Sequence, residues 1–341
     1  MTTVLERPLS ALSARANSEA PPALEIRHVS VSFPTRDGLV RAVNDVSFTV
    51  GEGRILAILG ESGSGKSVLL RTILGIQAPS ARVRGAVLVQ GTDLLQLPAA
   101  ERVRLRGSLL SMVFQNPMTA LDPVYTVEQQ IVESVRRHTK MSVGQARDRA
   151  LELLRLVQID SPERRLTAYP FELSGGMRQR VVIAMALACK PRVLLADEPT
   201  TALDVTVQAR VLDLFRSIRR ELGTAIVLVT HDVAVAAEVA DDVQVMYAGR
   251  VVETGPVRTV IGQPEHPYTR GLLNANVGPG HTARLVAIPG QPPNPAQLPE
   301  GCAFAPRCDS ALGACRTTVP ELVRVGALQY ARCIHAKELI D

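Results

Sequence analysis

Polar and hydrophobic residues alternate along residues 24–33, where the sequence reads L-E-I-R-H-V-S-V-S-F. A period of two places every second side chain on the same face, so this segment is predicted to be a half-buried strand. A turn containing Pro34, Asp37 and Gly38 is expected next, and a second strand over residues 43–50. Together the two strands are expected to form an antiparallel edge region.

Three later segments are short and almost entirely apolar, which is typical of strands buried on both faces. They cover residues 54–59, 193–196 and 224–229. The first leads into a glycine-rich turn and a helix predicted over residues 67–76, whereas residues 117–173 show a helical pattern rich in Arg, Glu and Leu. Strands that alternate with helices predict a doubly wound α/β core, into which the helical segment is inserted.

Composition agrees with such a core. Apolar residues make up 46% of the 341 residues, aromatic residues only 3%, and Trp is absent, so the core must be aliphatic. The net charge is +5, but the Arg residues are scattered, without a basic run or interleaved aromatics. This favours a solvated surface, such as one near anionic lipid headgroups, over a nucleic-acid site.

The N-terminal residues and the longest apolar segment indicate where in the cell the chain is expected. Residues 1–22 have no apolar h-region and are predicted to be a disordered tail rather than a secretory signal. The best candidate for a membrane span, residues 181–189, is far shorter than the roughly 20 residues required, and is expected to be a buried helix. The chain is therefore expected in the cytoplasm, with its Cys residues reduced unless a metal binds them.

The turn after residues 54–59 reads G-E-S-G-S-G-K-S and matches the phosphate-binding pattern G-x-x-x-x-G-K-[ST]. Glycines let backbone N–H groups turn inward around an anion, and the following helix adds partial positive charge. The Lys is expected to reach the β- and γ-phosphates of ATP, and the last Ser to bind Mg²⁺. A dinucleotide-binding fold, the rival, has different glycine spacing and needs no Lys-Ser pair. The candidate residues are Gly60, Glu61, Ser62, Gly63, Ser64, Gly65, Lys66 and Ser67.

Two adjacent carboxylates, Asp197 and Glu198, follow the apolar segment 193–196. Adjacent residues on a strand point to opposite sides, so two different roles are expected. Asp197 is predicted to hold magnesium through water, and Glu198 to orient or deprotonate the attacking water. Many strands end in an Asp that merely caps the next element, so the pattern gains weight from its place after the phosphate-binding turn.

Three further motifs complete an ordered series: V-F-Q-N-P around Gln115, L-S-G-G-M-R-Q-R over residues 173–180, and V-T-H-D over residues 229–232. Over residues 24 to about 255 this series resembles the ATP-binding cassette (ABC) family of transporter ATPases. The resemblance implies a P-loop NTPase fold in residues 23–255, with a RecA-like parallel sheet, an antiparallel β edge and a helical subdomain at about residues 117–173. It also implies hydrolysis of ATP to ADP and phosphate, coupled to transport across a membrane.

The resemblance implies roles for single residues. Gln115 is expected to touch magnesium and sense the membrane partner, His231 to bind the γ-phosphate, and Asp204 to couple two sites across a dimer. Phe33 is a candidate for stacking on adenine, with packing in the strand core as the alternative. Val68 stands where many members have Thr, so one side-chain contact to phosphate is expected to be missing.

The signature residues Ser174, Gly175 and Gly176 are implied to bind the γ-phosphate held by an opposite subunit. Met177 replaces the usual Gln and is expected to leave these contacts intact. Since the signature has no nucleotide to bind within its own subunit, two cassettes are expected to pack head to tail around two ATP molecules. Whether the pair is two copies or two similar chains stays open.

The end of the chain narrows the resemblance. E-H-P-Y at 265–268, I-P-G-Q-P-P at 288–293 and G-C-A-F-A-P-R-C at 301–308 are similar to the oligopeptide/dipeptide importer branch, which implies an extension over residues 256–341. The expected partners are two transmembrane permeases, a second ATPase subunit and an external substrate-binding protein, without nucleic acid, at the cytoplasmic face of the membrane.

Other functions are weighed against this one. Nickel or another small solute is the alternative cargo for the same machinery. A soluble ABC ATPase acting on nucleic acid or ribosomes is a second interpretation, but such relatives often carry two cassettes or long inserted arms. A P-loop kinase or GTPase has no need for the signature, and the guanine motif Asn-Lys-x-Asp is absent.

Four cysteines gather in the extension, and such a cluster in a cytosolic protein suggests a metal site. The spacing lacks the paired C-x-x-C of zinc sites and suits a [4Fe-4S] cluster at least as well, which the branch resemblance also favours. Zn²⁺, and unligated or disulfide-forming thiols, stay open as alternatives. A bound metal is expected to be structural, pinning a tail with little core of its own. The ligand candidates are Cys302, Cys308, Cys315 and Cys333, whereas Cys189 is expected to be plain packing.

Overall fold

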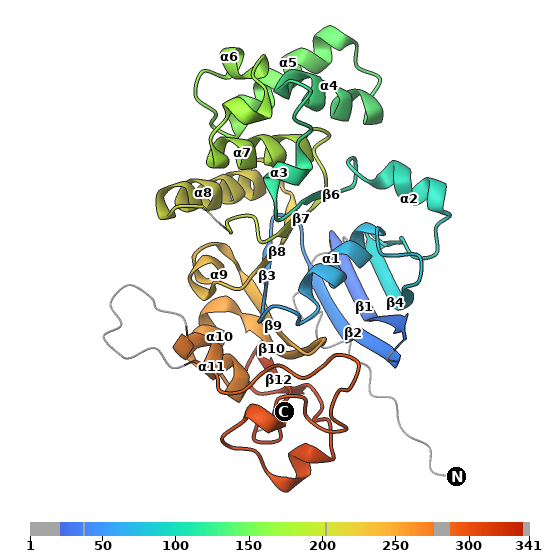
Figure 1. The fold of residues 1–341 in the computed structure, drawn as a ribbon, viewed down its shortest axis with the longest axis vertical. Coiled ribbons are helices and arrows are strands. Elements are labelled where there is room, and N and C mark those ends of the chain that lie inside the picture. The colour runs from blue at the N-terminus through green and yellow to red at the C-terminus, as the bar shows by residue number, and fades with distance from the viewer. Residues whose placement is uncertain (1–20, 37, 202, 276–286, 337–341) are drawn as a thin grey trace.

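The computed structural model describes residues 21–36, 38–201, 203–275 and 287–336 (Figure 1). The tail predicted to be disordered, residues 1–22, falls almost entirely outside these ranges. The described residues form two sheets, a set of helices above them and an extension at the lower end (Figure 1).

The larger sheet carries the predicted buried strands. Its order is β11-β12-β10-β9-β3-β8-β7-β6, and the five strands from β9 to β6 run parallel. β10 and the two short strands of the extension continue it by antiparallel pairing. The strands are β3 (Ile55–Leu59), β6 (Leu110–Val113), β7 (Val193–Asp197), β8 (Ala225–Thr230), β9 (Asp242–Tyr247), β10 (Arg250–Pro256), β11 (Val323–Arg324) and β12 (Tyr330–Ala331). The doubly wound α/β core predicted from the sequence is confirmed.

The smaller sheet is the antiparallel edge, in the order β2-β1-β4-β5. Its strands are β1 (Leu24–Thr35), β2 (Gly38–Val50), β4 (Arg82–Val89) and β5 (Thr92–Asp93). The predicted turn is tighter than expected, because Pro34 lies within β1 opposite Leu39, and Gly38 already begins β2. Thr35 donates its hydroxyl hydrogen to the carbonyl oxygen of Gly38 (2.8 Å), which closes the hairpin at that point.

Helices cover both faces of the larger sheet. The segment 117–173 is helical, as predicted, and with α7 and α8 it forms the upper part of the molecule in Figure 1. The helices are α1 (Lys66–Leu74), α2 (Ala99–Leu105), α3 (Pro117–Ala120), α4 (Val127–His138), α5 (Val143–Leu156), α6 (Pro162–Leu166), α7 (Gly175–Ala186), α8 (Val205–Leu222), α9 (Val233–Val239), α10 (Val257–Gly262) and α11 (Pro267–Ala275). Short 3₁₀ turns cover Pro170–Glu172, Ala305–Arg307 and Gly313–Arg316.

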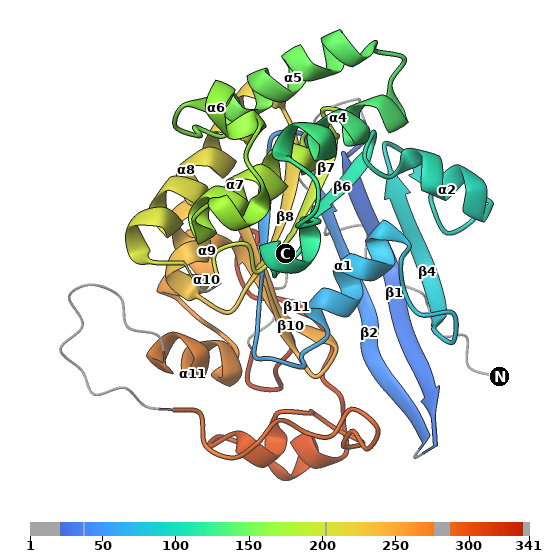
Figure 2. The ribbon, with the colours of Figure 1, turned by 45° about the horizontal axis from the view of Figure 1, so that its top comes forward.

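Helix α1 lies between the two sheets (Figure 2). Alternate residues of β3 explain this arrangement: Leu56 and Ile58 pack into the core shared with β1, β2 and α1, whereas Ala57 and Leu59 face the opposite side. The helix ends two residues earlier than predicted, because Gly75 adopts a left-handed conformation (φ 71°) and returns its N–H to the last turn.

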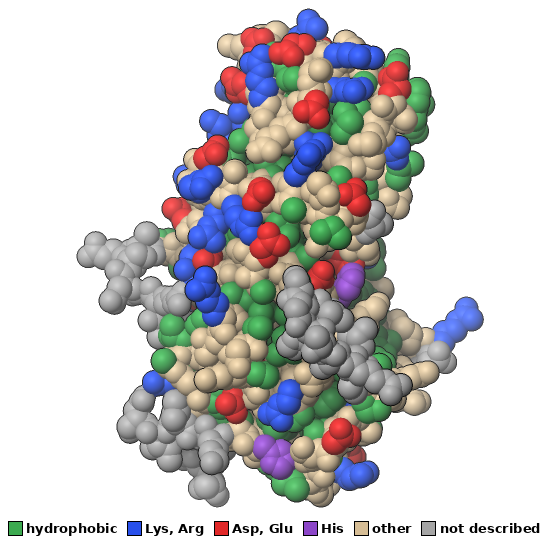
Figure 3. Space-filling view, turned by 90° about the vertical axis from the view of Figure 1, so that its left-hand side faces the viewer, with side chains coloured by type: hydrophobic (Ala, Val, Ile, Leu, Met, Phe, Trp, Pro, Cys, Tyr) green, Lys and Arg blue, Asp and Glu red, His purple; other side chains and the backbone are tan. Residues whose placement is uncertain are grey.

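Figure 3 shows how charged side chains are distributed on one face of the molecule. There the Lys and Arg side chains are interspersed with Asp and Glu over the upper part and do not gather in one basic patch. Within the described ranges, no helix combines the length and apolar character needed to cross a membrane.

The extension is built onto the larger sheet through Glu253, a fully buried residue of β10. Its carboxylate accepts hydrogen bonds from the backbone N–H groups of Glu265 and His266 (both 2.9 Å) and from the side-chain amide of Gln329 (2.8 Å). These bonds tie the start of α11 and the approach to β12 to one acidic side chain. Such charge-assisted hydrogen bonds are among the stronger ones in proteins.

His266 predicts a specific dependence of stability on pH. Burial, and to a smaller degree the nearby charge of Arg332, lowers the pKa of His266 from 6.5 to about 3. Below pH 6.5 the unfolded chain therefore binds a proton that the folded chain does not, and the free energy of unfolding falls as pH decreases. The expected loss from this group at pH 5, relative to neutral pH, is about 2 kcal/mol.

Urea unfolding at pH 7.5 and pH 5 checks this expectation. His266→Asn is the comparison, since an Asn oxygen can replace the ring Nδ1 that accepts the Tyr268 N–H (3.0 Å) but does not titrate in this range. The variant should lose less stability between the two pH values than the wild type. Equal losses in both proteins would show that His266 is not the group responsible.

Candidate functional site

The candidate residues meet at the carboxyl edge of the parallel strands, and the strand order explains why. β7 lies between β8 and β6 in the sheet. Glu198 follows β7, His231 follows β8, and Gln115 follows β6 two residues after its end. Ligands bind at this edge in open α/β sheets because the loops that leave the strands converge there.

Glu198 is the centre of this cluster. Its Oε2 accepts hydrogen bonds from Gln115 Nε2 (3.2 Å) and Thr201 Oγ1 (3.0 Å), and lies 3.2 Å from His231 Nδ1. Its backbone adopts a left-handed conformation (φ 47°), which is uncommon for a residue with a side chain. The backbone N–H of Glu198 donates to Val229 O on β8 (3.0 Å), which supports this conformation.

The phosphate-binding turn lies beside this cluster, between β3 and α1. A Cβ atom at Gly60 would lie 2.3 Å from Met246 O, and one at Gly65 would lie 2.2 Å from Ala42 O. The turn is therefore held so closely against the backbone of β2 and β9 that only glycine fits at these two positions. Within it, the hydroxyl oxygen of Ser64 is buried without a hydrogen-bond partner.

Lys66 closes the turn on itself. Its Nζ donates to the carbonyl oxygens of Gly60 (2.7 Å) and Glu61 (2.9 Å). Burial lowers the pKa of Lys66, and the surrounding carboxylates of Glu198, Asp197 and Glu61 act in the opposite direction. A lysine ammonium has three N–H donors, so one remains for a phosphate oxygen.

The predicted magnesium residues Ser67 and Asp197 are in direct contact. The Ser67 hydroxyl donates to Asp197 Oδ1 (2.9 Å), although the two residues come from α1 and β7. Burial raises the pKa of Asp197, while the hydrogen bond from Ser67 lowers it. A divalent cation at this position would favour the charged carboxylate. The buried carboxylate, the hydroxyl and the unpartnered Ser64 hydroxyl in the adjacent turn are the oxygen chemistry that Mg²⁺ and phosphate require.

The predicted signature residues lie on α7 and do not join this cluster. Ser174 caps α7, since its hydroxyl accepts the N–H of Met177 (3.3 Å), and both Ser174 and Gly175 are exposed. Gly176 is buried against α8, where a Cβ atom would lie 2.4 Å from Val207 Cγ1. Asp204 is exposed and caps α8 by accepting the N–H of Val207 (3.0 Å).

Comparison with known proteins agrees with this architecture. The family model described as "ABC transporter" matches residues 43–201, and the one described as "Oligopeptide/dipeptide transporter, C-terminal region" matches residues 252–315. The oligopeptide transport ATP-binding protein OppD of Salmonella typhimurium is 46% identical over 313 residues, which cover 92% of this chain and 93% of the relative. The chain belongs to the ABC transporter family.

Other members of the family agree with this assignment. The probable peptide ABC transporter ATP-binding protein y4tR of Sinorhizobium fredii is 44% identical over 331 residues, covering 96% of this chain and 99% of the relative. A dimeric structure of the ATP-binding cassette MJ0796, described as a post-hydrolysis state bound to ADP and Pi, superposes with a TM-score of 0.62 at 30% identity. It covers 69% of this chain and 99% of that one. The ABC cassette fold expected from the motifs is confirmed.

The stacking of Phe33 on adenine and the phosphate contact expected to be missing at Val68 stay predictions. Phe33 is half-buried in β1 and packs against the core shared with α1, which agrees with the strand-core alternative and does not test adenine stacking. Val68 likewise packs against that core from α1. Cys189 follows α7, is half-buried and packs against the core on the other face of the sheet. Burial raises the pKa of its thiol, as is expected for a packing residue.

The four cysteines of the extension are free thiols in the structure. Among the residues that the structure describes, no three His, Cys, Asp or Glu side chains form a group that could hold a metal ion. The iron–sulfur or zinc site predicted from the spacing is therefore not supported by this arrangement.

Sequence reasoning missed three residues of this site. Thr201, three residues after Glu198, bonds the Glu198 carboxylate. Tyr268, within the E-H-P-Y motif, bonds the second residue of the phosphate-binding turn, and Arg307, between two cysteines, forms an ion pair with it. Both residues lie in motifs quoted for the resemblance, but nothing in the local pattern connected either residue with a turn more than 200 positions away.

Proposed function

We infer that this chain is the ATP-binding and ATP-hydrolysing subunit of an ABC importer for peptides. The observation that carries the inference is the convergence of Gln115, Thr201 and His231 on the Glu198 carboxylate, beside a complete phosphate-binding turn. The peptide cargo is supported by the names of the relatives and by the match of residues 252–315 to the oligopeptide/dipeptide transporter model.

We propose a task in hydrolysis for each group. The backbone N–H groups of residues 60–67 would surround the phosphates, and Lys66 would add positive charge at the β- and γ-phosphates. Glu198 would accept a hydrogen bond from the attacking water and orient it, while His231 would donate to the γ-phosphate. Two hydrogen bonds, from Gln115 and Thr201, and the adjacent His231 keep Glu198 in place, and catalysis of this type depends on positioning and charge neutralisation.

The residues that would hold Mg²⁺ are Ser67 and Asp197, with Gln115 from the neighbouring strand end. When bound, the ion supplies neutralisation of charge on the β- and γ-phosphate oxygens. The chain's own part is to orient the oxygens. Ser67 and Asp197 are already 2.9 Å apart, and Gln115 is held near them through Glu198.

We further propose that two cassettes act as a pair. Ser174 and Gly175 are exposed at the start of α7, away from the contacts of their own phosphate-binding turn, and Asp204 is exposed at the start of α8. Val205, next to Asp204, has 83% of its surface exposed. These residues would bind the γ-phosphate and the facing loop of an opposite subunit, and hydrolysis would then release the pair.

The subunit is proposed to work at the cytoplasmic face of the membrane, with two permease subunits and an external substrate-binding protein. Nickel or another small solute is the alternative cargo. The deciding experiment is affinity purification of the full chain from detergent-solubilised native membranes, with co-purifying chains identified by mass spectrometry. Two polytopic permeases would support the importer. Recovery only in the soluble fraction, with ribosomal or nucleic-acid-processing partners, would overturn it.

A [4Fe-4S] cluster at Cys302, Cys308, Cys315 and Cys333 is proposed as a structural group of the extension. The sulfur of Cys315 accepts the backbone N–H of Leu312 (3.4 Å), and nearby backbone N–H groups favour the charged thiolates of Cys302, Cys308 and Cys333. Such bonds stabilise thiolate ligands and tune Fe–S clusters. Burial raises the pKa of the Cys302, Cys308 and Cys333 thiols, which favours the neutral thiol. A bound metal would instead stabilise the charged thiolate of each residue.

Metal content after anaerobic purification tests this group. Roughly four iron atoms per chain, with visible absorption that Cys308→Ser removes, are expected for a cluster held by four thiolates. One zinc per chain would favour the alternative ion. Absence of both iron and zinc would reject the metal site and leave free thiols or disulfides.

A further inference from the structure

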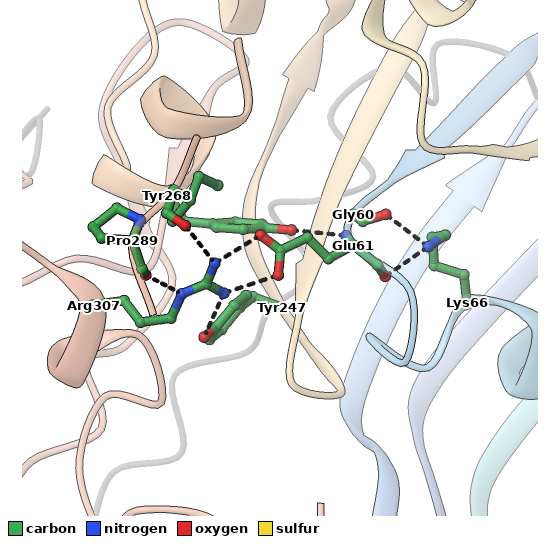
Figure 4. Close-up of polar contacts among 8 residues, drawn as sticks. Gly60, Glu61, Lys66, Tyr247, Tyr268, Pro289 and Arg307 are labelled. Atoms are coloured by element: carbon green, nitrogen blue, oxygen red, sulfur yellow. Dashed lines mark hydrogen bonds and ion pairs between the residues drawn. The ribbon is translucent and has the colours of Figure 1, made fainter. Parts of the chain in front are cut away.

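The extension touches the phosphate-binding turn directly. Arg307, in the 3₁₀ turn Ala305–Arg307, forms a two-pronged ion pair with Glu61, the second residue of the turn (Figure 4). Nη1 lies 2.8 Å from Glu61 Oε2, and Nη2 lies 3.1 Å from Glu61 Oε1. This parallel arrangement is the strongest geometry available to an arginine and a carboxylate.

Further hydrogen bonds from the extension and from β9 hold the guanidinium of Arg307 in place. The remaining donors of Arg307 bond the carbonyl oxygens of Pro289 (Nε, 2.9 Å) and Ile288 (Nη2, 3.4 Å) and the hydroxyl of Tyr247 (Nη1, 3.3 Å). All five N–H groups of the guanidinium are therefore used. Only 5% of the Arg307 side chain is exposed, against 25% for Glu61, so this pair differs from the weak ion pairs of open surfaces.

A second group of the extension holds the same residue. The hydroxyl of Tyr268, from α11, accepts the backbone N–H of Glu61 (2.8 Å). Tyr268 is fully buried, and its ring packs against those of Tyr247 and Phe304. Both the side chain and the backbone N–H of Glu61 are thus bonded to the extension, while its carbonyl oxygen accepts from Lys66.

We propose that Arg307 and Tyr268 are positioning residues for the nucleotide: by holding Glu61, the extension keeps the phosphate-binding turn in the shape that accepts ATP. The proposal rests on ATP binding at residues 60–67. It makes nucleotide affinity depend on whether the extension is docked. Arg307 directly precedes Cys308, so whatever fixes the cysteine segment also fixes the guanidinium.

The physical reason is pre-organisation. A turn already held in its binding shape loses little conformational freedom when a ligand arrives, whereas a loosened turn must be ordered by the ligand at the expense of affinity. Arg307 and Tyr268 touch the start of the turn and not Glu198, which orients the water from β7. Their loss should therefore weaken ATP binding more than it slows the chemical step.

The test measures ATP dissociation constants and steady-state hydrolysis for the full chain. Arg307→Met removes the positive charge but keeps much of the side-chain volume. Arg307→Lys keeps the positive charge but cannot form the two parallel hydrogen bonds to Glu61. Tyr268→Phe removes only a hydroxyl, and Glu61→Gln weakens the pair from the other side. Arg316→Met is the matched control, because Arg316 is exposed and also adjoins a cysteine of the extension, Cys315.

Arg307→Met should raise the dissociation constant and KM for ATP about tenfold with kcat changed less than twofold, and Tyr268→Phe should raise them about fivefold. Arg307→Lys should recover part of the loss. The Glu61→Gln/Arg307→Met double variant should bind ATP about as well as whichever single variant binds ATP less tightly. The reason is that both substitutions remove the same ion pair. Arg316→Met should match the wild type.

Several results would overturn the proposal. One is that Glu61→Gln and Tyr268→Phe bind ATP as the wild type does, which decides the matter even if Arg307→Met fails to fold. Another is that the single effects multiply in the double variant, which would mean independent sites. If Arg307→Met lowered the unfolding temperature but left KM for ATP unchanged, the role of Arg307 would be purely structural. A wild type that binds no ATP would instead reject the proposed function itself.

Discussion

Replacing Glu198 with Gln is expected to lower the single-turnover rate of ATP hydrolysis by roughly 10²–10⁴-fold, the usual size of a general-base effect. The amide keeps the shape of the side chain and an oxygen that accepts hydrogen bonds from Gln115 and Thr201 beside His231, so the cluster should persist. It removes the negative charge and the basicity that the attacking water needs. ATP binding should survive, because the phosphate contacts come from residues 60–67.

Rapid-quench measurement with enzyme in excess over radiolabelled ATP reports this step without interference from product release. Glu133→Gln is the matched control, since Glu133 is exposed on α4 and takes no part in the site. The control should hydrolyse ATP at the wild-type rate. If the Glu198→Gln variant were within a few-fold of that rate, Glu198 would lose its assigned role, whatever the affinity for ATP.

Gly65→Ala is expected to reduce ATP affinity by about 10²-fold or more. Gly65 has φ 101°, which a residue with a side chain rarely adopts, and the new Cβ would lie 2.2 Å from the carbonyl oxygen of Ala42. The neighbour is backbone and cannot swing away, so the turn or β2 must move. Backbone strain and forced overpacking each cost about 1–3 kcal/mol, and the turn can escape both only by leaving the shape that surrounds the phosphates.

Gly63→Ala separates strain from collision within the same turn. Gly63 also has a positive φ (79°), but an added Cβ would meet nothing within 4 Å. This variant should therefore lose about fivefold in affinity, the equivalent of about 1 kcal/mol. Equilibrium titration with a fluorescent ATP analogue compares the two. Equal losses in both variants would show that contact with Ala42 does not determine the shape of the turn.

Much of this site could be predicted because its parts are encoded locally. The turn at 60–67, the carboxylates after 193–196 and the histidine after 224–229 each occupy a few adjacent residues at the end of an apolar strand. Parallel strands bring their carboxyl ends to one edge of a sheet, so these residues had to lie near one another. Which of them touch was decided by the strand order, which places β7 between β6 and β8 and so puts Glu198 within reach of both Gln115 and His231.

Some predictions from the local sequence were wrong because a contact elsewhere in the fold outweighed the conformational preference of a single residue. Pro34 suggested a turn, yet pairing of β1 with β2 continues past it to Thr35 and Gly38. The helix predicted to end at residue 76 stops at Leu74, where Gly75 makes the left-handed cap available. The cysteine spacing suggested a metal site, and that site stays a proposal, because spacing along the chain does not determine how a loop brings its thiols together and the described side chains do not form a group able to hold a metal ion.

The sequence alone determined the cassette: its strands, its phosphate-binding turn, its acidic pair and their order along the chain. Only the tertiary structure decided that the extension adds strands to the same sheet through Glu253, and that Arg307 reaches Glu61 across 246 positions. The reason is physical. A motif depends on backbone conformations within a few residues, whereas an ion pair between distant segments depends on how all the intervening elements pack, and no local pattern records that.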